Sequence, residues 1–232
     1  MIKAFLSTSA INLIVVICMF LQGIYIANQF GVSGKGLSTL YINCFSIALL
    51  IGTGGIRQAS SFLLKEGRFS KSQIVSAQNA FILIFSVFIM LLVACYFYFF
   101  LEPNNLIQIS IILIFPFALY INYRSYYFLV TQNFVYINII RTLQTVVPFV
   151  LFVLLDFISV IRIENQFITL FFSYIILYCI VSFKFNHFNH GITTHVSISN
   201  LWDILKLSCK YSFPLILLGL NFKVDSFILA SY

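Results

Sequence analysis

Seven polar or charged residues lie within or at the ends of long apolar stretches, and their side chains are the ones best placed to do chemistry. They are Gln22, Asn28, Arg57, Arg141, Asn221, Lys223 and Asp225. Polar groups are costly inside a membrane, where they line ligand pathways or hydrogen-bond between helices. The sequence therefore predicts either a cavity that binds a substrate or a set of structural contacts at these positions.

The charged members of this set leave two interpretations open. Arg57 follows a glycine-rich stretch at residues 52–55, and it is either a cation that lines a cavity or an anchor whose side chain extends to the membrane surface. Arg141 presents the same choice. Asn221 and Asp225 are four residues apart and share one helix face. Asp225 is therefore either a functional acid facing protein or water, or a structural acid paired with a neighbouring helix.

Two local motifs suggest phosphate or metal binding but fail on their details. Residues 31–36 read Gly-x-x-Gly-Lys-Gly, whereas a phosphate loop has four residues between its glycines and a Ser or Thr after the Lys. His187, His190 and His195 have no carboxylate or Cys among them to complete a metal site. No Ser/His/Asp arrangement or carboxylate pair is visible, so we expect neither an enzyme, a cofactor nor a metal ion.

The elements that position these residues follow from composition. Of 232 residues, 61% are apolar and 8% are charged, and the mean hydropathy is +1.04. A water-soluble domain has about a quarter of its residues charged, so the bilayer must be the solvent here. The apolar runs are unbroken rather than alternating, and only helices then satisfy the backbone in lipid. The sequence predicts an all-α polytopic membrane protein.

Seven apolar segments are expected. They are Ala4 to Ala27, Leu37 to Leu64, Ile74 to Leu101, Leu106 to Val130, Phe134 to Phe157, Gln166 to Phe185 and Leu207 to Tyr232. The first six form an N-terminal lobe at residues 1–185. Residues 186–206 form a cytoplasmic linker with an amphipathic interfacial helix, because Leu201, Trp202 and Leu205 recur at helical spacing. Residues 207–232 form the seventh helix, the start of an incomplete second lobe.

The net charge of +7 bears on topology rather than on nucleic acid, because the basic residues form no block. Ten basic residues fall on the side of the N-terminus, and only Lys35 and Arg162 fall on the other. The ten are Lys3, Arg57, Lys65, Arg68, Lys71, Arg124, Arg141, Lys184, Lys206 and Lys210. Basic residues are retained on the cytoplasmic face, so we expect a cytoplasmic N-terminus.

Several stretches share the pattern of one known family. They are Asn28-Gln-Phe-Gly-Val-Ser-Gly-Lys-Gly36, Gly55-Ile-Arg57 with Glu66-Gly67, Phe134-Val-Tyr-Ile-Asn-Ile-Ile-Arg141, and Tyr211-Ser-Phe-Pro214 followed by Asn221 and Asp225. With them the chain resembles the polysaccharide and lipid-linked oligosaccharide flippases, of the O-antigen type, in the multidrug/oligosaccharidyl-lipid/polysaccharide exporter superfamily. Family members have twelve to fourteen helices, so this chain is expected to be a fragment or a truncated product.

The resemblance implies a function and its partners. Such proteins move undecaprenyl-pyrophosphate-linked oligosaccharides across the bacterial cytoplasmic (inner) membrane by alternating access, for the synthesis of surface polysaccharide and lipopolysaccharide. The implied partners are the lipid-linked oligosaccharide, membrane lipids and other polysaccharide-assembly proteins. Arg57 resembles a position where some members carry a cation that meets the pyrophosphate, and Asp225 resembles a frequent acid of the seventh helix. A polymerase-like membrane enzyme and a drug or ion-coupled exporter of the same superfamily remain the alternatives.

Overall fold

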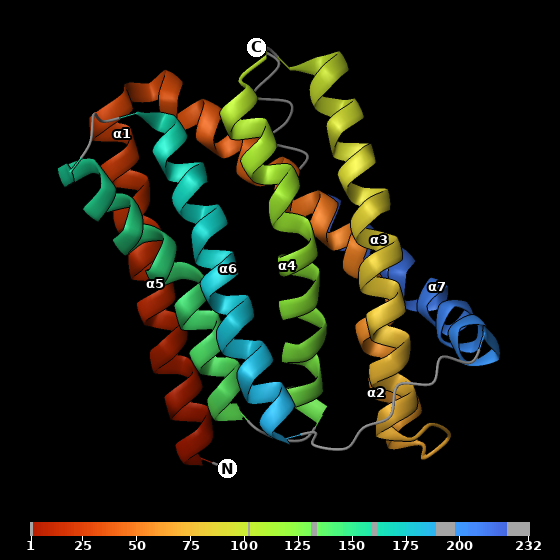
Figure 1. Ribbon diagram of the computed structural model, residues 1–232. Coiled ribbons are helices and arrows are strands. Elements are labelled where there is room, and N and C mark those ends of the chain that lie inside the picture. Colours follow the sequence, from red (N-terminus) through yellow and green to blue (C-terminus); the bar gives the residue numbers. More distant parts are fainter. Residues whose placement is uncertain (1, 102, 131–133, 159–161, 189–197, 222–232) are drawn as a thin grey trace.

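The computed structural model describes residues 2–101, 103–130, 134–158, 162–188 and 198–221. These residues form helices joined by short connections, and no strand occurs among them. The helices are α1 (Ile2–Thr53), α2 (Ile56–Lys65), α3 (Lys71–Phe100), α4 (Asn105–Val130), α5 (Phe134–Ile158), α6 (Ile163–Phe188) and α7 (Ile198–Asn221). Figure 1 shows them as a bundle, with α7 lying at its side.

The bundle crosses a membrane several times. Five helical stretches of the described chain are long and apolar enough to span one: Ser9–Lys65, Lys71–Phe100, Asn105–Ser125, Val135–Ile158 and Ile163–Phe185. The first of these has 57 residues, about 85 Å of helix at ~1.5 Å per residue, which is more than twice the hydrocarbon thickness of ~30 Å. It therefore makes two passes. The prediction of an all-α, multi-pass membrane protein is confirmed.

Those two passes are separated at Gly31, where α1 changes direction at the upper left of Figure 1. Gly31 has φ 70° and ψ −167°, a conformation that is essentially restricted to glycine. The predicted segments left residues 28–36 outside any helix, but only Gly31 leaves helical geometry within α1. One glycine is sufficient, because the non-helical backbone conformation of Gly31 by itself interrupts the helix. We call the end of the bundle where α1 begins the proximal end, and the end at Gly31 the distal end.

A second glycine break divides the segment that was predicted as one helix from Leu37 to Leu64. Gly54 has φ +42°, and α1 ends at Thr53 before α2 begins at Ile56. The backbone N–H of Gly55 donates to Ser212 Oγ of α7 at 2.7 Å. A partner 157 residues away in sequence therefore occupies a donor that a continuous helix would use internally.

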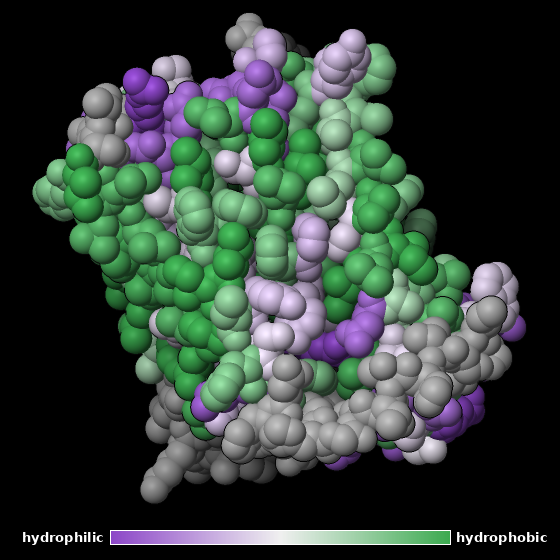
Figure 2. All heavy atoms as spheres, in the orientation of Figure 1, coloured by the Kyte–Doolittle hydropathy of each residue, from purple (hydrophilic) through white to green (hydrophobic). Residues whose placement is uncertain are grey.

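The bundle core lies between α1, α3, α4, α5 and α6, and aromatic rings pack among its aliphatic side chains. The ring of Tyr41 meets those of Phe97 and Phe167 edge to face, with centroids 5.4 and 5.6 Å away. Phe45 packs in the same way against Tyr174, at 5.8 Å. Such contacts stabilise the packing beyond the area that they bury, by roughly 0.5–1.5 kcal/mol each. The outer surface is mostly apolar, as Figure 2 shows for one face, which suits lipid contact.

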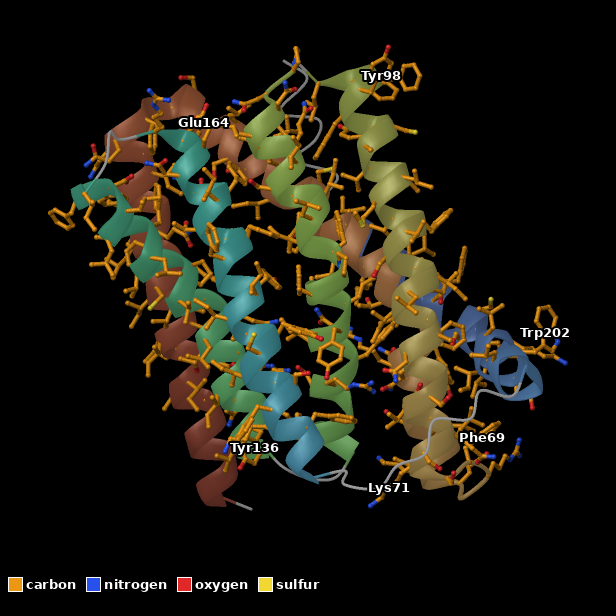
Figure 3. The ribbon with its side chains drawn as sticks, in the orientation of Figure 1. Phe69, Lys71, Tyr98, Tyr136, Glu164 and Trp202 are labelled. Carbon is orange, nitrogen blue, oxygen red and sulfur yellow. The ribbon has the colours of Figure 1, made fainter. Side chains whose placement is uncertain are left out.

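The helix α7 differs from its prediction. It runs from Ile198 to Asn221 without interruption, so the expected boundary between residues 206 and 207 falls inside a continuous helix. The side chain of Ile204 is buried in a cluster with Ile56 and Leu63 of α2, whereas Trp202 projects away from the bundle (Figure 3). Packing against α2 continues across the predicted boundary. Residues 222–232 of the expected seventh span lie outside the described residues.

Candidate functional site

Arg57 and Arg141, which the sequence singled out separately, line one cavity near the proximal end of the bundle. The cavity has a volume of about 230 Å³. Its lining residues are Arg57, Asn122, Ser125, Ile137, Ile140, Arg141 and Gln144. Two cations and no carboxylate are among them, so we call it the cationic cavity.

Neighbouring groups fix the position of Arg57. It lies in the first turn of α2, directly after the glycine break, and its Nη1 donates to Asn122 Oδ1 of α4 at 3.5 Å. The Asn122 Nδ2 in turn donates to the carbonyl oxygen of Ala118 at 2.8 Å. This second bond turns the amide oxygen of Asn122 toward the guanidinium. The geometry favours a cavity-lining role for Arg57 over that of a surface anchor.

A second, larger polar cavity of about 480 Å³ lies toward the distal end. Its polar lining consists of Gln22, Lys35, Ser38, Thr39, Asn43, Ser46, Gln144, Thr145, Gln166 and Tyr174. Ser38 Oγ donates to Gln166 Oε1 at 2.8 Å, which ties α1 to α6 at this site. Amides and hydroxyls predominate, and Lys35 is the one charged group among the described residues of this lining, so we call it the amide cavity.

The two cavities adjoin along α5. Arg141, Gln144, Thr145 and Pro148 occupy positions i, i+3, i+4 and i+7 of that helix, which is the spacing of a single face. Arg141 lines the cationic cavity, Thr145 and Pro148 line the amide cavity, and Gln144 lines both. This face of α5 therefore runs from the cationic cavity to the amide cavity. We call Gln144 the neck residue, because it lines both cavities.

Arg124 is a third arginine inside the bundle, and it has a different environment. It is 2% exposed, and the charge count had included it among the basic residues on the side of the N-terminus. Its Nη1 donates to Gln78 Oε1 at 2.9 Å and its Nη2 donates to Asn79 Oδ1. Its guanidinium carbon also lies 4.2 Å from the ring centroid of Phe185. These contacts join α4 to α3 and α6, so Arg124 is a structural cation.

The remaining predicted site residues have different positions. Gln22 lines the amide cavity. Asn28 is exposed toward the distal end of the first pass and lines neither of the two cavities. The side chain of Asn221, together with Lys223 and Asp225, lies outside the described residues, and their proposed roles stay predictions.

Sequence reasoning missed several residues that the fold brings to the site. Asn122 and Ser125 are three residues apart on α4, so both reach the cationic cavity. Their polar character within an apolar segment was the available signal. Lys35 was only counted on the side opposite the N-terminus, yet it lines the amide cavity. Asp156 was not singled out, but it is 7% exposed within α5 and accepts hydrogen bonds from Tyr25 and Asn165.

Metal binding finds no support in the part of the chain that the structure describes. No group of three His, Cys, Asp or Glu side chains there is placed to hold an ion. The side chains of His187, His190 and His195 are outside that part. The chemistry that the described cavities offer is hydrogen bonding and positive charge.

Comparisons with models of protein families, with curated proteins and with solved structures found no match. The class of the molecule therefore rests on its fold and its cavities. It is a multi-pass helical membrane protein that contains a cationic cavity and an adjoining amide cavity inside its bundle.

Proposed function

We propose that the protein is a flippase that moves undecaprenyl-pyrophosphate-linked oligosaccharide units across the bacterial cytoplasmic membrane. One observation carries the proposal: Arg57 and Arg141, from two different helices, line one cavity within a membrane-spanning bundle. Guanidinium groups bind phosphate through two parallel charge-assisted hydrogen bonds. Two of them in one cavity suit a diphosphate.

A lipid-linked substrate also fits a cavity of this kind. The isoprenoid tail can remain in the bilayer while the polar head passes through a space lined by amides, hydroxyls and cations. A head group that carries charge cannot cross the hydrocarbon core unaided. The resemblance to the lipid-linked oligosaccharide flippases supports the choice of substrate, and the chain would act by alternating access together with other polysaccharide-assembly proteins.

The orientation that we propose places the N-terminus in the cytoplasm. Exposed cations gather near the proximal end, where Lys65, Arg68 and Lys71 lie around the connection between α2 and α3 and Lys184 lies near the end of α6. Figure 3 places Lys71 at this end and Glu164 at the opposite one. Basic residues are retained on the cytoplasmic face during insertion. The cationic cavity would then lie nearer the leaflet in which a lipid-linked precursor is made.

The test replaces Arg57 at the native locus. Arg57→Ala should abolish surface-polysaccharide output at normal protein abundance, because the phosphate loses its partner. Arg57→Lys should retain part of the output, since the charge remains while the two-pronged hydrogen bonding is lost. Arg162→Ala is the control, because Arg162 is exposed and lines neither cavity. Normal output from Arg57→Ala at normal abundance would refute the proposal.

A further inference from the structure

The neck residue Gln144 has an unengaged amide. Its side chain lines both cavities and makes no hydrogen bond with any residue that the structure describes. Neighbouring polar groups on the same helix differ in this respect, because Thr142 and Thr145 bond to backbone carbonyls of their own helix. An amide carries two donors and an acceptor with two lone pairs. Gln144 therefore has donor and acceptor capacity free at the point where the cavities meet.

The cavities on either side of Gln144 suit different chemical groups. The cationic cavity presents two guanidinium groups within about 230 Å³, which suits a compact anion. The amide cavity presents four side-chain amides, five hydroxyls and one ammonium within about 480 Å³. Paired donors and acceptors of this kind match a group rich in hydroxyl and acetamido functions. Its volume falls in the range of roughly 300–1,000 Å³ that is usual for ligand pockets.

We infer that the two cavities are two subsites for one ligand, and that Gln144 is the specificity-determining residue between them. The diphosphate binds at Arg57 and Arg141, the uncharged sugar attached to it extends into the amide cavity, and the Gln144 amide hydrogen-bonds to the sugar at the neck. The inference rests on the proposed function, because it assumes that the cationic cavity takes a phosphate. It adds that the protein recognises the first sugar as well as the diphosphate.

The experiment uses one reporter cysteine in each cavity, in the protein freed of its five native cysteines and held in nanodiscs. Ser125→Cys reports on the cationic cavity and Thr39→Cys on the amide cavity. Both hydroxyls bond to backbone carbonyls of their own helix, so these changes are mild. The probes are uridine diphosphate and uridine-diphosphate N-acetylglucosamine, and the readout is protection from a thiol reagent.

The nucleotide alone should protect Ser125→Cys only, and the nucleotide sugar should protect both reporters. Gln144→Leu should raise the nucleotide-sugar concentration that half-protects Thr39→Cys by roughly tenfold, as expected for about one lost hydrogen bond. Gln144→Asn should raise it less, and protection of Ser125→Cys by the nucleotide alone should stay unchanged. Gln29→Leu, an exposed glutamine change outside both cavities, is the control.

The possible outcomes distinguish a failure of this inference from a failure of the proposed function. If Gln144→Leu leaves both probes unchanged, or weakens both equally, the role of Gln144 is refuted while phosphate binding stands. If the nucleotide sugar protects only Ser125→Cys, the amide cavity is not a sugar subsite. If neither probe protects Ser125→Cys, the cationic cavity does not bind a diphosphate. Both the proposed function and this inference are then refuted.

Discussion

Two arginines that share one cavity repel each other, and a low-dielectric bundle strengthens that repulsion. Arg57 is held by the amide of Asn122, which carries no charge to offset it. Arg141 is exposed to the cavity beside it. Such a pair is favourable when an anion lies between the two groups. The arrangement therefore resembles a binding site more than a structural contact.

Arg124 shows what a structural arginine looks like in the same protein. Its guanidinium is fully buried and bonded to two amide oxygens of α3, and aromatic rings of Tyr120 and Phe185 cover it. Cation–π contacts are strongest at such desolvated sites. Both terminal nitrogens of Arg124 bond within the fold, whereas Arg141 lines a cavity.

Replacing Arg124 should therefore lower stability rather than binding. In Arg124→Leu, the buried amide oxygen of Gln78 and the half-buried one of Asn79 both lose a donor, at a cost of about 1–3 kcal/mol for a buried group left unsatisfied. Thermal unfolding of the purified protein in detergent should move to lower temperature, and Arg68→Ala, an exposed change at the proximal end, should leave it unchanged. An unaltered melting temperature in Arg124→Leu would show that its contacts contribute nothing to the fold.

At the scale of the elements, the junction of α1 and α2 with α7 positions Arg57. A Cβ atom added at Gly55 would overlap the carbonyl oxygen of Ser208 and lie 2.8 Å from the backbone nitrogen of Ser212. The backbones of α2 and α7 thus meet directly at Gly55. Arg57 is two residues further along, so this close contact lies directly beside the cation.

Gly55→Ala should separate α7 from α2. The added methyl group meets backbone rather than a flexible side chain, so the helices must move apart. Ser208→Cys, placed at a buried position of α7 in a cysteine-free background, should then react faster with a thiol reagent. Gly23→Ala is the matched control, because no atom lies within 4 Å of its added Cβ. Equal labelling rates in the two variants would contradict the close contact.

Helix positions were predictable from the sequence, and glycines marked the regions of the breaks, but which glycine forms each break was not predictable. The segment predicted from Phe134 to Phe157 differs from α5 by one residue, since α5 ends at Ile158. The prediction succeeds because an unbroken apolar run must be helical in lipid. At the break after Gly54, the backbone N–H of Gly55 bonds to Ser212 of α7 instead of to its own helix. No local pattern encodes a contact over 157 residues.

The candidate site was predictable in part for a similar reason. Arg57, Arg141 and Gln22 were singled out because polar groups are costly inside apolar segments and are usually retained there for a function. The grouping of Arg57 with Arg141 in one cavity depends on how α2, α4 and α5 are rotated against one another, which tertiary packing decides. Sequence reasoning therefore found the two cations but not the cavity that they share. It also missed Asn122 of the cationic cavity and Gln166 of the amide cavity.

Over the whole molecule, the proposed orientation is testable with two reporter cysteines. Arg68→Cys lies in the connection between α2 and α3, and Asn104→Cys precedes α4 at the other end of the bundle. In a cysteine-free background, an impermeant thiol reagent should label position 104 but not position 68 in intact cells, because exposed cations mark the cytoplasmic side. Both positions should react after permeabilisation. Labelling of 68 alone in intact cells would invert the topology.

The central claim is that the cationic cavity carries a lipid-linked diphosphate across the membrane. Its most direct measurement uses the purified protein in liposomes that hold a fluorescent polyprenyl-diphosphate N-acetylhexosamine in both leaflets, with an impermeant reductant added outside. The unaltered protein should bring the inner-leaflet label to the reductant, so that nearly all fluorescence is lost. With Arg57→Ala and Arg141→Ala combined, only the label already in the outer leaflet should be lost. Complete loss with the combined variant, at the rate of the unaltered protein, would contradict the claim.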